Sequence, residues 1–149
     1  MGKQDNMDDP ILMRERLAEL EALLKRLKAS EEKYRGIVEN ANSTILLMDT
    51  KGNINFINKF GQRFFGFQEK DILGKNVVGT IVSGDLLSGD DLASMIKDIV
   101  ENPERHSVNE NENMRSNGEF VRILWTNKAI IGNDGNIREI LCIGNQITK

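Results

Sequence analysis

The 149-residue sequence has few of the residues on which several common kinds of site depend. It contains one cysteine, Cys142, which excludes an intrachain disulfide and favours a reducing cytoplasm. It contains one histidine, His106, which excludes a histidine-based metal cluster. No long apolar run is present, and the net charge is −3, so we expect neither a membrane contact nor a nucleic-acid partner.

Patterns typical of catalysis are also missing. There is no Gly-x-Ser-x-Gly segment and no Cys-His pair at a workable spacing. The pair Gly74-Lys75 precedes Asn76 and lacks the upstream glycine of a phosphate-binding loop. We therefore predict that the chain is not an enzyme.

The first feature that the chain does have is a long amphipathic helix. Residues 1–9 are polar and acidic and are expected to be disordered. Pro10 suits a first helical turn, and strong helix formers follow without a glycine until Gly36. Apolar residues recur at alternating steps of four and three, which defines a heptad seam through Met13, Leu17, Leu20, Leu24, Leu27 and, more weakly, Tyr34. We predict a coiled-coil-like helix over 10–34 and a compact domain over 35–149.

Three arrangements can cover this seam. A helix from Ile11 to about residue 40 is roughly 45 Å long, which favours pairing with a second copy in a parallel coiled coil. The helix can instead fold back onto the domain that follows it. Ala22 and Leu23 widen the apolar stripe, so a bundle of more helices is a third arrangement.

After the helix, the sequence predicts two strands, short helices and three further strands. Ile45 and Leu47, then Ile54 and Phe56, alternate as half-buried strand residues do, and Asn58 stands where a helix N-cap is expected. The remaining elements are expected as helices at 58–65, 69–73 and 89–100 and strands at 107–115, 119–131 and 136–148. We predict an α+β fold, a five-stranded antiparallel sheet with short helices on one face, preceded by the long helix.

An ordered set of short motifs resembles one family. The set begins with Asp49, Gly52, Ile54 and Asn58, continues through Gly66-Phe67, acidic residues at 69–71 and Gly74-Lys75, and ends with Asn117-Gly118, Trp125-Thr126-Asn127 and Asn133-Asp134-Gly135. In this order and at these spacings, residues 30–149 resemble a PAS sensor domain. One departure is Gln146, which stands where many family members have the Asp of a terminal Asp-Ile-Thr. That Asp often helps to couple the domain to its flanking helix.

The resemblance implies a pocket between the concave face of the sheet and the helices. The candidate lining residues are Phe56, Phe60, Phe64, Ile72, Val77, Met95, Ile99, Trp125, Asn127, Leu141 and Ile143, together with Ile45, Leu47 and Ile81. Asn127 is polar on a mostly apolar strand face, so its amide either bonds to the neighbouring backbone or contacts a polar ligand. Cys142 is expected to be a small buried core residue.

The resemblance does not name a cofactor. Flavin photochemistry of the LOV subclass needs a cysteine where this chain has Val77. Covalent haem needs a Cys-x-x-Cys-His segment, which is absent, and the polar surroundings of His106 favour an exposed loop over a haem ligand. The alternation of Asn and Glu over 109–113 is expected to lie on an exposed part of a strand, where acidic charge discourages edge pairing.

Two functions follow from the resemblance. The first is a sensory or regulatory domain that responds to a small ligand and relays the signal through a dimeric N-terminal helix. Such domains commonly precede a histidine kinase of a two-component system, a diguanylate cyclase or another output domain. The alternative is a dimerisation or docking module without a ligand, in which bulky side chains fill the cavity: Phe60, Phe64, Phe65 and Trp125.

Overall fold

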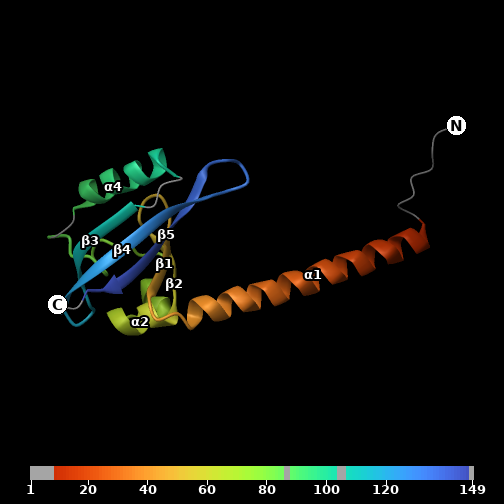
Figure 1. The fold of residues 1–149 in the computed structure, drawn as a ribbon, viewed down its shortest axis with the longest axis horizontal. Coiled ribbons are helices and arrows are strands. Elements are labelled where there is room, and N and C mark those ends of the chain that lie inside the picture. Colours follow the sequence, from red (N-terminus) through yellow and green to blue (C-terminus); the bar gives the residue numbers. More distant parts are fainter. Residues whose placement is uncertain (1–8, 86–87, 104–106, 148–149) are drawn as a thin grey trace. The chain divides into compact units, whose positions relative to one another are not determined.

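The computed structural model describes residues 9–85, 88–103 and 107–147 (Figure 1). It divides into two compact units, Met1–Val38 and Glu39–Lys149. Three parts of the sequence on which predictions were made lie outside the described residues. They are residues 1–8 of the segment predicted to be disordered, His106, and Thr148 at the end of the last predicted strand.

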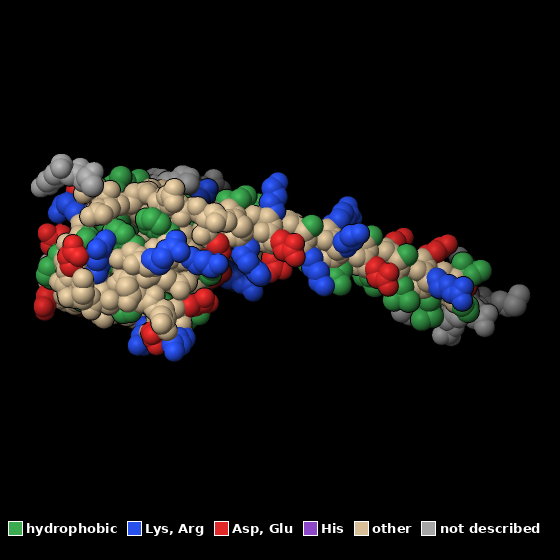
Figure 2. Space-filling model, turned by 90° about the horizontal axis from the view of Figure 1, so that it is seen from below, with side chains coloured by type: hydrophobic (Ala, Val, Ile, Leu, Met, Phe, Trp, Pro, Cys, Tyr) green, Lys and Arg blue, Asp and Glu red, His purple; other side chains and the backbone are tan. Residues whose placement is uncertain are grey.

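Helix α1, Pro10–Glu39, makes up the described part of the first unit and ends close to the expected residue 40. Asp9 starts the helix, because its carboxylate accepts a hydrogen bond from the backbone N–H of Ile11 at 2.9 Å. No residue of α1 is buried, and charged side chains of both signs alternate with apolar ones along it (Figure 2). Among the described residues, no helix has the length and apolar character needed to span a membrane.

The second unit is built on one five-stranded sheet. Its strands are β1 (Thr44–Met48), β2 (Ile54–Ile57), β3 (Ser107–Met114), β4 (Phe120–Ile131) and β5 (Ile137–Gln146). All neighbours are antiparallel, in the order β2-β1-β5-β4-β3. The predicted sheet is confirmed, and every predicted strand is found within a few residues of its expected bounds.

Short helices cover one face of this sheet. They are α2 (Lys59–Phe65), α3 (Glu69–Ile72) and α4 (Gly89–Glu101). Gly61 brings α2 against the sheet, since a Cβ added there would lie 2.9 Å from the Thr44 side chain. Ser88 caps α4 through a capping box with Asp91, whose backbone N–H donates to the Ser88 hydroxyl at 3.1 Å. We call the face beneath these helices the inner face.

Asn58 joins β1 to the start of α2, which confirms its predicted role as an N-cap. Its Oδ1 accepts the backbone N–H groups of Gly61 and Ile45, both at 3.0 Å. Its Nδ2 donates to the Ser43 carbonyl at 2.9 Å. Asn58 is fully buried, so its amide replaces water at a helix start and a strand start at once.

Asp49 organises the turn between β1 and β2. Its Oδ1 accepts the backbone N–H groups of Lys51 at 2.8 Å and Asn53 at 2.9 Å. Partial burial acts to raise the pKa of Asp49, but the hydrogen bonds from Asn53 and Lys51 outweigh it and hold the pKa below its ordinary value. The turn therefore depends on the ionised carboxylate.

Candidate functional site

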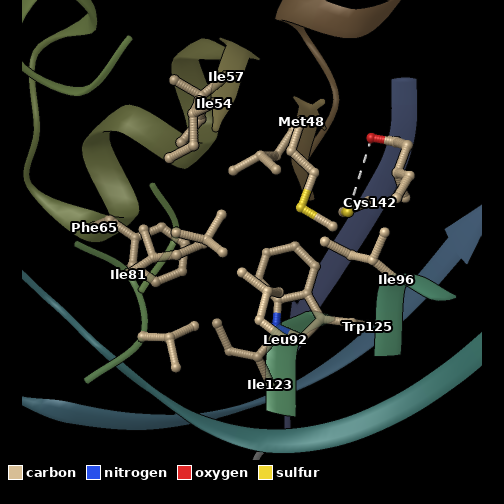
Figure 3. Close-up of a cluster of buried hydrophobic side chains, with 14 of the residues drawn as sticks. Met48, Ile54, Ile57, Phe65, Ile81, Leu92, Ile96, Ile123, Trp125 and Cys142 are labelled. Carbon is tan, nitrogen blue, oxygen red and sulfur yellow. Dashed lines mark hydrogen bonds between the residues drawn. The ribbon is translucent and has the colours of Figure 1, made fainter. Parts of the chain in front are cut away.

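A cavity of about 40 Å³, partly open to solvent, lies between the inner face of the sheet and α4. Figure 3 shows the surrounding core, with Met48, Ile96, Trp125 and Cys142 pointing toward one another. The walls are apolar except for four asparagines, and they are formed by Leu46, Met48, Val77, Ile81, Val82, Leu92, Met95, Asn109, Asn111, Asn113, Trp125, Asn127 and Cys142. No residue of this described lining carries a charge.

Part of the predicted pocket is brought together here. Val77, Ile81, Met95, Trp125 and Asn127 all line the cavity. Ile72 and Ile99 are buried in the same hydrophobic core but do not reach the cavity wall.

The residues predicted from β1, β2 and β5 lie on the opposite, outer face. Phe56, Leu141 and Ile143 are half-buried there, and so are Ile45 and Leu47. Their neighbours in sequence face inward instead: Leu46 and Met48 on β1, Ile140 and Cys142 on β5. In these strands the residues that face inward and those that face outward are both apolar, so the alternation along the sequence could not show which residues face the core. An error of one residue places every side chain of the strand on the wrong face of the sheet.

Phe60 and Phe64 lie elsewhere as well. Their rings stack with centroids 6.0 Å apart, and they line a second hollow together with Thr44 and Ile123. The guanidinium of Arg115 lies 4.4 Å from the centroid of the Phe64 ring, in a cation–π contact. Phe65 is buried in the core, so Trp125 is the only one of the four bulky side chains that borders the cavity.

Trp125 is held firmly at the cavity wall. Its indole Nε1 donates to Asn113 Oδ1 at 3.0 Å. Its ring lies over Gly144 of β5, where an added Cβ would meet ring carbons at 2.6–2.9 Å. Because this is the only tryptophan in the chain, its fluorescence reports on the surroundings of the cavity.

The polar part of the cavity differs from the prediction. The Asn127 amide Nδ2 donates to the side-chain Oδ1 of Asn109 at 2.5 Å. The Asn-Glu alternation of β3 was expected on an exposed surface; its glutamates do face outward, but its asparagines face inward. The missed signal was the pairing of β3 with β4, which places Asn109 opposite the inward-facing Trp125.

Cys142 forms part of the wall as a buried thiol. Burial raises the pKa of Cys142 to about 12, so the neutral thiol prevails near neutral pH. A protonated, buried thiol is a weak nucleophile, which agrees with a packing role.

Comparison with known proteins gives one family. The family model for the PAS fold matches residues 32–147. No curated protein matches the chain.

Several solved structures share the fold. The PAS domain of an HTR-like protein from Haloarcula marismortui has a TM-score of 0.72 and 17% identity, and the alignment covers 85% of this chain and 99% of that domain. The PAS domain of the quorum-sensing receptor RpfR from Cronobacter turicensis, in complex with BDSF, has a TM-score of 0.60 and 23% identity, with 74% and 99% covered.

A domain of the sensory box sensor histidine kinase/response regulator from Geobacter sulfurreducens has a TM-score of 0.61 and 20% identity, with 80% and 96% covered. At these identities, the structural likenesses show a shared fold. The family match extends over most of the sequence and includes the whole sheet with its cavity. The chain belongs to the PAS family.

Proposed function

We propose that this chain is a sensory module that takes a small molecule into the cavity beneath α4. The observation that carries the proposal is a small, partly open apolar cavity with polar amides on one wall. Apolar cavities with a few placed polar groups are the usual form of a small-molecule site. The similar RpfR domain is known in complex with BDSF and with C12:0, which supports the use of this fold for small ligands.

The second part of the proposal is a homodimer formed through α1. All six seam residues of the predicted coiled coil are more than half exposed, from 51% at Met13 to 65% at Leu27. An exposed apolar seam of this kind marks an interaction surface. A second copy of α1 presents the same seam, and pairing removes both from water.

The third part is relay to an output domain, as in a histidine kinase or a diguanylate cyclase. Helix α1 ends at Glu39 and β1 begins at Thr44, so a short connection joins the helix to a strand. Leu46 and Met48 of that strand line the cavity. A ligand that shifts β1 thereby changes the angle or rotation of α1. The location that we propose for the chain is the cytoplasm, with which the free thiol of Cys142 agrees.

The alternative function is a dimerisation module without a ligand. The size of the cavity favours this version, because a cavity of about 40 Å³ has room for only a few water molecules. In this version, α1 still forms the dimer and the PAS unit serves as a packed body.

Native mass spectrometry of the freshly purified chain tests both functions. We expect a dimer that carries a defined additional mass. A dimer without added mass supports the module without a ligand, and a monomer contradicts the role of α1.

A pair of lysine variants provides the matched control. Leu24→Lys places a charge in the seam, whereas Ala29→Lys adds the same charge on the other side of the helix. We expect Leu24→Lys to be monomeric and Ala29→Lys to remain dimeric. Equal behaviour of the two variants contradicts a coiled coil in this register.

A further inference from the structure

Strand β3 carries a ladder of three asparagines that face the cavity. Asn109, Asn111 and Asn113 alternate with two glutamates, so the pleat of the strand separates amides from carboxylates. Glu110 on the outer face pairs with Arg122 at 2.5 Å. The charges thus remain at the surface, and the cavity receives neutral polar groups.

The two ends of the ladder are already bonded. Asn113 accepts from the Trp125 indole at 3.0 Å and donates to the Ile81 carbonyl at 3.1 Å. Asn109 accepts from the Asn127 amide at 2.5 Å. These contacts hold the strand and the indole in place on both sides of Asn111.

The middle asparagine of the ladder has an acceptor without a hydrogen bond. Asn111 lines the cavity, and its Oδ1 is shielded from water without a hydrogen-bond partner among the described residues. Buried carbonyl oxygens are normally bonded, so one that remains open in a cavity points to a missing donor.

The cavity also disfavours ionised groups. Its described walls hold apolar side chains and amides but no lysine, arginine, aspartate or glutamate. A carboxylate or an ammonium group would lose its hydration there without gaining a partner of opposite charge.

We propose that the cavity selects a small, uncharged molecule with an apolar body and a hydrogen-bond donor that reaches Asn111 Oδ1. This inference rests on the proposed sensory function and names its ligand class: neutral hydroxyl, amide or N–H compounds. The cavity accepts a few non-hydrogen atoms as it stands, and the half-buried, flexible side chain of Met95 at its wall allows it to enlarge.

Four probes of similar length test the selection. 1-Butanol and diethyl ether are isomers, so they differ in the donor and not in composition, while butanoate and butylammonium carry charge. None of them absorbs where tryptophan is excited, and Trp125 emission therefore gives each affinity directly. We expect 1-butanol to bind about tenfold more tightly than diethyl ether, and the ions not to bind measurably.

Variants at the ladder separate recognition from structure. Asn111→Leu keeps the volume and removes the acceptor, so it should bind the alcohol and the ether equally, with its thermal unfolding retained. Glu110→Gln, on the outer face, should keep the tenfold preference. If Asn111→Leu weakens both probes by the same factor, the residue has only a structural role and the inference is wrong.

The remaining outcomes distinguish the inference from the function on which it rests. Equal binding of alcohol and ether by the unaltered protein, or tighter binding of an ion, overturns the ligand class but leaves a working cavity. Failure of all four probes to bind overturns the ligand class as well. If native mass spectrometry also finds no added mass, the sensory function falls with it.

Discussion

Asn58 shows how one buried side chain can hold two elements together. It bonds to Gly61 at the start of α2, to Ile45 on β1 and to Ser43 before β1, and no part of it reaches water. Asn58→Ala leaves these backbone groups unsatisfied, and we expect the free energy of unfolding to fall by about 2–4 kcal/mol. Urea unfolding followed by Trp125 emission measures the change.

A control for Asn58 lies three residues earlier on the same segment. Asn55 is exposed, and its side chain makes one hydrogen bond, at 3.1 Å, to the carboxylate of Glu139. Asn55→Ala should change the stability by less than about 0.5 kcal/mol. If the two variants unfold at the same urea concentration, the buried amide is not the link between β1 and α2.

At the scale of elements, the pairing of β4 with β5 depends on a glycine. Trp125 lies opposite Gly144, and an added Cβ would approach the indole to 2.6 Å. Gly144→Ala should therefore destabilise the protein by about 1–3 kcal/mol, or displace the ring into the cavity. Both results should weaken 1-butanol binding, which a titration followed by Trp125 emission measures. A displaced ring should also shift the wavelength of maximum Trp125 emission.

Gly89 provides the matched glycine control. It begins α4, and an added Cβ would meet no atom within 4 Å. Gly89→Ala should leave stability and 1-butanol binding unchanged, or stabilise the helix slightly. An equal loss of binding in both variants would mean that ring displacement at Gly144 is not the cause.

The same elements show what the sequence could and could not predict. Strand and helix positions followed from turn glycines, caps and apolar periodicity, and the structure confirms them. The inner face was harder, because Leu46 and Leu47 are equally apolar and only the three-dimensional packing chooses between them. The asparagine ladder was missed because an isolated polar strand is typical of a surface, whereas pairing with β4 makes β3 a cavity wall.

At the scale of the whole molecule, the two compact units differ in how they are stabilised. Every residue of the buried core belongs to the unit Glu39–Lys149. Helix α1 contributes no buried residue, so within the described residues its stability comes from its own helix formers, and the proposed dimer would add to it. The proposed sensing and the proposed dimer formation thereby belong to separate parts of one chain.

This division predicts two separate unfolding transitions. In the full chain, the helical signal of α1 should be lost first, at a urea concentration that rises with protein concentration, because pairing of the helices follows mass action. Trp125 emission should follow a second, cooperative transition that does not depend on protein concentration.

A variant that lacks residues 1–31 should be monomeric and keep this second transition with the same midpoint. Leu24→Lys in the full chain should match the shortened variant in oligomeric state and in the Trp125 midpoint. If removal of residues 1–31 abolishes the cooperative Trp125 transition, α1 is part of the folding unit of the sheet, and the division into two parts is wrong.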